Sequence, residues 1–261
     1  MHVSNELDYP LDTARIAADV RSYGPGLICF SITTNQWYFA RQIGRALKNG
    51  LDVPVIVGGH HPTAAPDMVL EEPWVDMLCR GEGDYVLPEV IRRLEAAEPM
   101  DGINNLVHRK GDDVVKEPMG AFPPDLDALP FEDRGVFDYT RLVETRSGWA
   151  EVIVTRGCPY PCTYCFNQPL FDEYRRDIKK RDGATLRRKE FTRRRSVDST
   201  IRMLKEIRAA YPNIKHFTFV DDIMAEEGGG KRKNSESSSS GDQIQIPSPR
   251  AACKRQKRTY Q

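Results

Sequence analysis

The stretch VPVIVGGHHPTAAPD, which runs from Val53 to Asp67, decides how the first half of this chain is expected to fold. It opens with a short apolar run, Val53–Val57, that ends at once in Gly58-Gly59. A short apolar run bounded by glycine is typical of a strand that is buried on both faces of a parallel sheet. Similar runs lie at Leu27–Ile32 and Val75–Cys79, so we expect three such strands.

Segments with helical spacing alternate with these runs. Phe39, Ile43 and Leu47 recur at the interval of a helix, and a second helix is expected over Tyr85–Ala97. Asp84 is its expected N-cap. The residues expected on the inner side of this second helix are Val86, Val90, Ile91 and Leu94. Alternating strands and helices predict an α/β fold, a doubly wound Rossmann-like sheet whose ligand site lies at the carboxyl ends of the strands.

The middle of the chain begins with a predicted hairpin and then changes in composition. Asn105–His108 and Asp113–Lys116 flank a turn that contains Gly111. Residues Glu117–Pro130 are rich in Pro, Asp and Gly, which predicts a linker. The run Glu151–Arg156 that follows predicts the first strand of a second domain.

The second domain is expected to continue with one helix and one strand. Ser196 is the expected cap of the helix, whose inner residues would be Val197, Ile201, Leu204 and Ile207. Ile214–Val220 predicts a strand that delivers Asp221 and Asp222 at its carboxyl end. The alternative role for these paired aspartates is a helix N-cap.

The segment Arg175–Arg195 is strongly basic. Charge runs of this kind usually form a solvated helix face or a loop, and we favour that interpretation. The alternative is contact with an anionic cofactor or substrate.

Three cysteines share one short turn, Cys158, Cys162 and Cys165 in the run TRGCPYPCTYCFNQ. Their spacing is C-x3-C-x2-C, one thiolate short of the four that usually hold an iron–sulfur cluster. Such a loop can hold three irons of a cube and leave the fourth without a protein ligand. An open coordination position distinguishes a catalytic metal site from a structural one.

Zinc and a disulfide are the other interpretations of these cysteines. Zinc prefers four Cys or His ligands, and the remaining candidates are distant in sequence: His216, Cys253, His108 and Cys79. A disulfide would leave one thiol over. An iron–sulfur site is therefore the favoured interpretation, and zinc remains the alternative.

Composition indicates an intracellular globular protein. The 38 Lys and Arg residues balance 38 Asp and Glu residues, so net charge gives no reason to expect nucleic acid as a partner. No apolar run approaches the roughly 20 residues of a membrane span. The start of the chain lacks a signal-peptide pattern. Free cysteines predict a reducing compartment, the cytoplasm.

The cysteine turn resembles the cluster-binding motif of the radical SAM enzymes. The resemblance implies that Cys158, Cys162 and Cys165 bind a [4Fe-4S] cluster and that its open iron binds S-adenosylmethionine (SAM). It places Tyr164 near the nucleoside of SAM. It also makes Asp221 and Asp222 acceptors for the methionine amino group, and it implies an electron donor such as a flavodoxin or ferredoxin.

The first half resembles the cobalamin-binding domain that precedes the radical SAM domain in one large subclass. The phrases VIVGGHHPTAAPD and RGEGD carry this resemblance. The residues that it places beside the corrin or its nucleotide tail are Ser31, Thr33, Gly58, Gly59, Thr63, Gly81, Glu82 and Gly83. His60 and His61 are discounted as cobalt ligands, because neither lies in an Asp-x-His-x-x-Gly arrangement.

These resemblances divide the chain into four parts. Residues 1–116 are expected to be an N-terminally short cobalamin-binding-like domain, with Val3–Leu7 as the second strand of that fold. Residues 117–148 would be a linker, 149–225 the start of a truncated (β/α) radical SAM barrel, and 226–261 a disordered tail. The chain as a whole is expected to be an internal fragment.

The function implied is reductive cleavage of SAM and methyl transfer to an unactivated carbon of an unknown small molecule, without nucleic acid or membrane. Three alternatives remain open. The first is an oxidative cyclase of the same family. The second is a non-catalytic fragment that still binds a cluster or a corrinoid, and a zinc-stabilised fold is a third.

Overall fold

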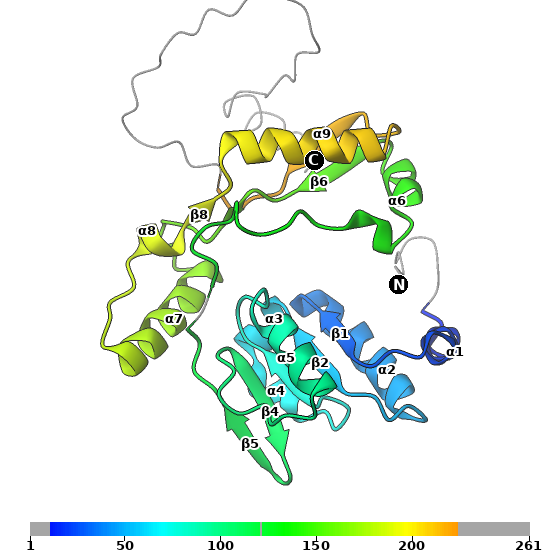
Figure 1. Cartoon of the computed structure of the whole chain (residues 1–261), viewed down its shortest axis with the longest axis vertical. Helices are drawn as coiled ribbons and strands as arrows, with labels where there is room; N and C mark the ends of the chain where they lie inside the picture. Colours follow the sequence, from blue (N-terminus) through cyan, green and yellow to red (C-terminus); the bar gives the residue numbers. More distant parts are fainter. Residues whose placement is uncertain (1–10, 121, 224–261) are drawn as a thin grey trace, which may run out of the picture. The chain divides into compact units, whose positions relative to one another are not determined.

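The computed structural model describes residues 11–120 and 122–223 (Figure 1). The strand expected at Val3–Leu7 and the tail expected at 226–261 lie outside the described residues. So does Cys253. None of the helices in the described ranges is long and apolar enough to cross a membrane.

A five-stranded sheet occupies the first half, and its strands lie side by side in the order of the chain. The strands are β1 (Ile28–Ser31), β2 (Val55–Gly58), β3 (Met77–Cys79), β4 (Leu106–Lys110) and β5 (Asp113–Lys116). Strands β1, β2 and β3 are parallel, as predicted from their apolar runs. Strand β4 is antiparallel to β3 and forms the predicted hairpin with β5, so the sheet is mixed rather than wholly parallel.

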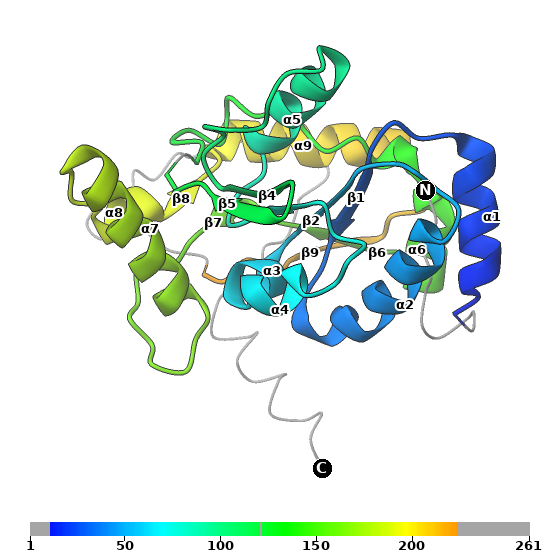
Figure 2. The ribbon, with the colours of Figure 1, turned by 90° about the horizontal axis from the view of Figure 1, so that it is seen from below.

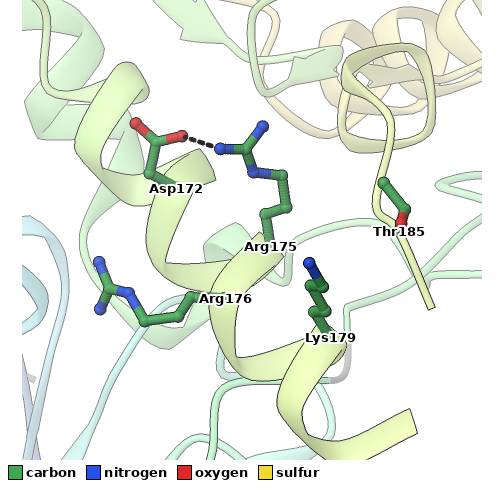
Figure 3. A pocket seen from close by; sticks show the side chains of 5 residues that line it. All are labelled: Asp172, Arg175, Arg176, Lys179 and Thr185. Carbon is green, nitrogen blue, oxygen red and sulfur yellow. Dashed lines mark ion pairs between the residues drawn. The ribbon is translucent and has the colours of Figure 1, made fainter. Parts of the chain in front are cut away.

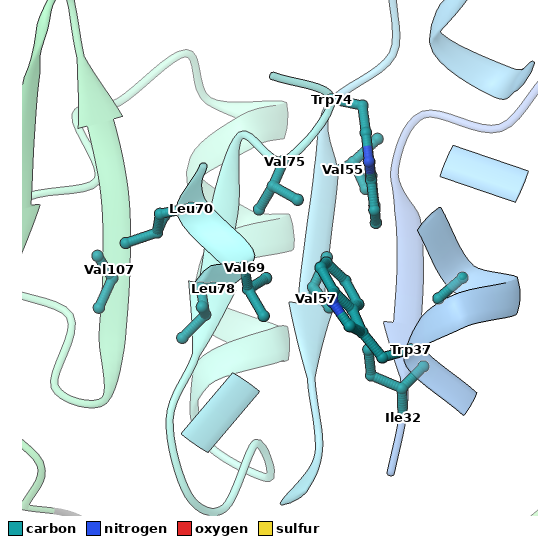
Figure 4. Close-up of a cluster of buried hydrophobic side chains, with 11 residues drawn as sticks. Ile32, Trp37, Val55, Val57, Val69, Leu70, Trp74, Val75, Leu78 and Val107 are labelled. Carbon is teal, nitrogen blue, oxygen red and sulfur yellow. The ribbon is translucent and has the colours of Figure 1, made fainter. Parts of the chain in front are cut away.

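Helices lie on both faces of this sheet (Figure 2). They are α1 (Thr13–Tyr23), α2 (Trp37–Lys48), α3 (His60–Ala64), α4 (Pro66–Leu70) and α5 (Val86–Glu95), with a 3-10 turn η1 (Thr34–Gln36) before α2. Alternation along β2 sends Val55 and Val57 into one core, with α2 and α4, and Ile56 into another, with α5. Figure 4 shows the first core, in which Trp37 lies beside Val57 and Trp74 lies beside Val55.

Two expectations for the helices of the first half are wrong. Asp84 does not cap α5, because Tyr85 occupies the N-cap position and the Asp84 carboxylate binds Arg156. Ile91 is 44% exposed rather than on the inner side of α5, where Val86 and Val90 are buried.

The described part of the second half, residues 122–223, contains two small two-stranded sheets, four α-helices and a 3-10 turn. Its elements are η2 (Arg134–Val136), α6 (Tyr139–Thr145), β6 (Trp149–Val152), β7 (Thr155–Arg156), α7 (Asn167–Asp182), α8 (Arg188–Phe191), β8 (Arg193–Arg194), α9 (Val197–Ala210) and β9 (His216–Phe219). Strand β6 pairs in parallel with β9, and β7 pairs antiparallel with β8. The single strand expected at Glu151–Arg156 is thus divided between two sheets. One parallel pair is all that residues 122–223 show of the expected barrel.

Helix α9 begins where the sequence predicts. The Ser196 hydroxyl oxygen accepts a hydrogen bond from the Ser199 backbone N–H at 3.1 Å. Leu204 and Ile207 are buried as expected, but Val197 is 74% exposed and Ile201 is 39% exposed. For these two residues the predicted inner face is wrong.

The stretch expected as a linker, residues 117–148, contains buried residues and helix α6. Met119 is fully buried in a core with Tyr174 and Phe191. Leu126 is buried as well. A separate core joins α6, α9 and the β6–β9 pair.

Candidate functional site

The carboxyl ends of β1, β2 and β3 lie together at one edge of the five-stranded sheet. Ser31 is in register with Gly58, and the Ile32 N–H donates to the Gly58 carbonyl at 2.9 Å. A side chain added to Gly58 would lie 3.6 Å from the Cys79 Cβ at the end of β3. The structure therefore brings the predicted strand-end residues to one edge, where Ser31 and Thr33 are exposed.

Gly59 allows the loop after β2 to pack directly on the end of β1. Its φ is +101°, and an ideal Cβ at this position would lie 2.5 Å from the Ile32 carbonyl oxygen. The His61 N–H donates to that same oxygen at 3.2 Å. No other residue type fits this turn without strain.

Thr63 joins two of the strand-end loops. Its hydroxyl donates to the Gly59 carbonyl at 2.8 Å and accepts from the Gly81 N–H at 2.9 Å. The side chain is buried, so both hydrogen bonds are made inside the protein. Thr63 therefore holds the β2 and β3 loops at a fixed separation.

The two adjacent histidines have different surroundings. His61 is buried against the Trp37 ring at 5.1 Å, and its Nδ1 lies 3.3 Å from the Thr34 hydroxyl. Burial lowers the pKa of His61, and within the described residues its buried Nε2 has no hydrogen-bond partner. His60 is exposed, and its ring lies edge-on to Phe166 at 5.3 Å.

The loop after β3 contacts the second half of the chain. Gly81 has a φ of +75°, and an added Cβ would lie 2.0 Å from the Tyr174 hydroxyl. The Glu82 N–H donates to that hydroxyl at 2.9 Å, and the Glu82 carboxylate binds Arg156 at 2.7 Å and also Arg193. Gly83 lies against Cys79, with an ideal Cβ 3.6 Å from its Sγ.

The cysteine turn follows β7 directly. Cys158 is buried, Cys162 and Cys165 are partly buried, and all three thiols are free. The Cys165 N–H donates to the Cys162 carbonyl at 3.2 Å. Gly157 permits the turn because its φ is +75° and an added Cβ would lie 2.4 Å from the Phe191 carbonyl oxygen.

In the part of the chain that the structure describes, no three Cys, His, Asp or Glu side chains gather in a metal-binding group. The structure thus places the cysteines in one turn without bringing their sulfur atoms into a ligating arrangement. Three free thiols in one turn, without a fourth neighbouring ligand, still form a donor set suited to a cluster with one open iron. Tyr164, between the last two cysteines, is 91% exposed.

Asp221 connects the ends of β6 and β9. Its Oδ1 accepts hydrogen bonds from the Val154 N–H at 2.8 Å and from the Thr155 hydroxyl at 2.7 Å. Its Oδ2 is buried and has no hydrogen-bond partner among the described residues. Asp222 accepts from the Asn167 side-chain amide at 2.8 Å.

The basic segment divides into an exposed part and a buried part. Arg175, Arg176 and Lys179 extend from exposed positions of α7 and line an open cavity of about 480 Å³ together with Asp172 and Thr185 (Figure 3). Arg193 and Arg195 are buried, which the prediction of a solvated face did not foresee. Arg193 Nη1 donates to the Pro123 carbonyl at 2.7 Å.

Sequence reasoning missed the partners of the β3 loop. Tyr174, Arg156 and Arg193 were not singled out, nor was Asn105, whose amide donates to the Glu82 carbonyl at 3.1 Å. The spacing of Phe171, Tyr174 and Ile178 along α7 was an available signal, because these residues lie on one helical face and are all buried.

Comparison with known proteins identifies the first part of the chain. The B12 binding domain family matches residues 2–91. An uncharacterized methyltransferase from Pyrococcus horikoshii is 26% identical over 158 residues, which make up 60% of this chain and 34% of the relative. The anaerobic magnesium-protoporphyrin IX monomethyl ester cyclase from Cereibacter sphaeroides is 29% identical over 177 residues, 64% of this chain and 28% of the cyclase.

The fold matches that of a solved enzyme. The structure of the cobalamin-dependent S-adenosylmethionine radical enzyme OxsB, with aqua-cobalamin and S-adenosylmethionine bound, aligns with a TM-score of 0.61 at 20% identity. The alignment covers 81% of this chain and 27% of OxsB. This chain therefore spans about a third or less of the length of these proteins. Residues 2–91 match the B12 binding domain family, and the chain is similar to proteins described as a methyltransferase, a monomethyl ester cyclase and a cobalamin-dependent radical SAM methyltransferase.

Proposed function

We propose that this chain is the cofactor-binding part of a cobalamin-dependent radical SAM enzyme that transfers a methyl group to an unactivated carbon of a small molecule. The observation that carries the proposal is a contact between two segments far apart in sequence. The strand-end loops of a B12 binding domain touch the segment that bears the three cysteines, through Glu82 with Arg156 and through His60 with Phe166.

The cysteine turn would hold the iron–sulfur cluster. Cys158, Cys162 and Cys165 would supply the thiolates, and the absence of a fourth ligand in the turn would leave one iron open. Bound together, the cluster, SAM and cobalamin supply radical formation and methyl transfer, which is chemistry that belongs to the cofactors. An external electron donor such as a flavodoxin or ferredoxin would reduce the cluster.

Asp221, Asp222 and Tyr164 would position SAM. The Oδ2 of Asp221 has no hydrogen-bond partner among the described residues, and it suits a donor such as the methionine amino group. A hydrogen bond from a charged donor to a buried acceptor is stronger than one from a neutral donor. Asp222 lies beside it and is held by Asn167. The exposed Tyr164 side chain is free to cover the nucleoside.

Cobalamin would lie over the carboxyl ends of β1, β2 and β3. The exposed Ser31 hydroxyl offers a hydrogen bond at this edge, and the Thr33 hydroxyl, whose proton is donated to Asn35 or Gln36, is left as an acceptor. Of the two neighbouring histidines, His61 is buried, and its Nε2 has no hydrogen-bond partner among the described residues. This nitrogen would suit a polar group of the ligand. The cofactor set is therefore compatible with the residues present.

An oxidative cyclase is the second candidate, because the relative from Cereibacter sphaeroides that matches at 29% identity is a cyclase. A chain that binds cofactors without turnover is the remaining alternative. Both differ from the proposal in what happens after SAM binds. Cofactor loading and SAM cleavage therefore have to be measured separately.

Anaerobic reconstitution of the 261-residue chain with iron and sulfide tests the cluster. We expect a brown protein whose electron paramagnetic resonance spectrum, after reduction, changes when SAM is added. Cys158→Ala, Cys162→Ala and Cys165→Ala should each lose this spectrum, whereas Cys29→Ala, which removes a thiol of β1, should keep it. Stoichiometric zinc without iron uptake would refute the proposal.

Two further measurements separate the alternatives. Hydroxocobalamin should co-elute with the chain in gel filtration, and its loss would remove the corrinoid from the proposal. If the cluster forms but SAM is never cleaved under strong reductant, the chain binds cofactors without turnover.

A further inference from the structure

The loop Arg80–Asp84, here called the RGEGD loop, contacts the cysteine turn on its upstream side. Arg156 stands immediately before Gly157 and Cys158. Its Nη1 lies 2.7 Å from Glu82 Oε2 and 2.6 Å from Asp84 Oδ2. The backbone that enters the cysteine turn is thus held by two carboxylates of one loop.

The same loop also contacts the downstream side of the turn. Helix α7 starts at Asn167, soon after Cys165, and its residue Tyr174 accepts the Glu82 N–H at 2.9 Å. One residue earlier on α7, the Glu173 carboxylate binds Arg80. The RGEGD loop therefore binds both the strand that enters the cysteine turn and the helix that follows it.

The RGEGD loop and α7 also fit sterically at Gly81. The position has no room for a side chain, because an added Cβ would lie 2.0 Å from the Tyr174 hydroxyl and 2.9 Å from the Met119 methyl group. The left-handed backbone at Gly81, with a φ of +75°, turns Glu82 toward Arg156 and Arg193. Gly81 is thus explained by protein contacts alone.

The charges in this contact are shielded from water. The Arg193 side chain is 5% exposed, that of Glu82 is 18% exposed and that of Arg156 is 35% exposed. Removing one partner from such a group leaves another charge buried without compensation, which costs far more than the loss of a surface ion pair. The RGEGD loop therefore acts as a fixed attachment point.

We infer that the RGEGD loop positions the cysteine turn against the strand-end edge of the B12 binding domain, and that Glu82 and Asp84 are positioning residues rather than cobalamin contacts. The catalytic meaning of this placement rests on the proposed function. The placement itself rests only on the contacts of the RGEGD loop with β7, β8 and α7. It can therefore be tested on the cofactor-free chain.

Hydrogen exchange on the whole cofactor-free chain measures the placement. In Glu82→Gln and in Arg156→Gln we expect the amides of residues 155–166 to exchange at least about tenfold faster, because each variant removes charged hydrogen bonds. The amides of β1 and β2 should keep their rates. The double variant should accelerate exchange by less than the two single effects combined, because the Glu82–Arg156 contact is lost in both single variants, whereas the Asp84–Arg156 and Glu82–Arg193 contacts are lost separately.

Matched controls separate positioning from general loss of stability. Glu89→Gln removes a carboxylate that pairs with Arg92 and Arg93 on the surface of α5, and it should leave residues 155–166 unchanged. Arg156→Lys, which keeps the charge, should restore part of the protection. Unchanged exchange of residues 155–166 in Glu82→Gln, or equal acceleration of β1 and β2, would overturn the inference.

Cofactor binding gives the second readout. Hydroxocobalamin retention by Glu82→Gln should remain within about twofold of the parent chain if Glu82 does not touch the corrinoid, while loss of a charged ligand contact would cost about tenfold or more. A tenfold loss of hydroxocobalamin retention, with unchanged hydrogen exchange of residues 155–166, would indicate that Glu82 contacts the corrinoid. If the parent chain binds neither iron nor corrinoid, the proposed function fails, and the exchange experiment still decides the positioning role.

Discussion

At the scale of single residues, Gly59 holds the most demanding backbone conformation of the strand-end edge. Its φ is +101° and the Ile32 carbonyl oxygen occupies the place of a side chain. Gly59→Ala should lower the free energy of unfolding by roughly 2–4 kcal/mol, because it adds a steric clash to backbone strain. Urea denaturation monitored by circular dichroism measures the loss.

Gly102 offers a matched control for Gly59. Its φ is +81°, but no atom lies within 4 Å of an added Cβ. Gly102→Ala should therefore lower the free energy of unfolding by only about 1 kcal/mol, which is the cost of placing an alanine in a left-handed conformation. Equal losses in the two variants would show that contact with the end of β1 contributes nothing.

The surroundings of Cys79 strongly alter the chemistry of its thiol. Burial, assisted by the charge of Asp84, raises the pKa of the Cys79 thiol to about 12. At pH 8 its alkylation by iodoacetamide should be roughly a thousandfold slower than that of an ordinary thiol, because only the thiolate reacts. Peptide mass spectrometry should find Cys162 and Cys165, which are partly exposed, labelled before Cys79.

The labelling experiment has an internal reference. In urea all described cysteines should react at similar rates, since unfolding removes the burial of Cys79. Fast labelling of Cys79 in the folded chain would contradict its position at the end of β3.

At the scale of elements, Glu72 joins helix α2 to the turn that precedes β3. Its carboxylate accepts hydrogen bonds from Arg41 at 2.7 Å, from Arg45 at 2.9 Å and from the Trp74 indole at 2.9 Å. Burial opposes ionisation of Glu72, but these hydrogen bonds outweigh it and lower its pKa. A lowered carboxyl pKa contributes stability above the unfolded value, and this contribution is lost as the pH falls through the folded pKa.

Glu72→Gln should therefore destabilise the chain by about 1–3 kcal/mol at pH 7, with less effect below about pH 4. Glu71→Gln, at the neighbouring exposed position, should change little. Unfolding free energies of both variants across this pH range test the prediction. A difference that does not depend on pH would show that the charge of Glu72 is not involved.

The elements of the first half were predictable because their apolar runs are short and sharply bounded. The expected strands at 27–32 and 75–79 contain β1 and β3, and the expected strand at 53–57 covers β2 except for its last residue, Gly58. Helix faces were less predictable, as Ile91 and Val197 show. Helical spacing assigns such residues to an apolar stripe, but tertiary packing decides which edge of that stripe is covered.

The candidate site was predictable only in its local parts. The cysteine turn and the glycine after β2 can each be recognised from a few neighbouring residues of the sequence. The partners of Glu82 do not, because Tyr174 lies 92 residues away in the chain and Arg193 lies 111 residues away. Pairings of this kind depend on how the two halves fold together, which charge pattern alone does not reveal.

At the scale of the whole described chain, α7 has an apolar core of its own that is separate from the sheet. This core consists of Met119, Phe171, Tyr174, Ile178, Leu186 and Phe191. Phe191 is 2% exposed and its ring lies 5.5 Å from that of Phe171. Phe191→Ala should lower the free energy of unfolding of this core by about 3–5 kcal/mol, because it leaves a cavity. Helix α7 and the cysteine turn should then lose their packing against this core.

Regional hydrogen exchange distinguishes this outcome from global unfolding. Residues 167–182 should lose protection in Phe191→Ala, while β2 should keep most of its own. Tyr160→Ala, at a position 57% exposed, should leave both regions unchanged. Uniform acceleration along the chain would mean that the α7 core and the sheet unfold as one unit.

The strand order of the five-stranded sheet has a consequence for synthesis. Each strand from β2 to β5 pairs with the strand that precedes it in the chain, so its neighbour has already been synthesised. The strands of this sheet can therefore pair one after another as the nascent polypeptide leaves the ribosome. Strand β6, by contrast, pairs with β9, which is translated only after α7, α8 and α9. The β6–β9 pair can therefore form only after these helices have been synthesised.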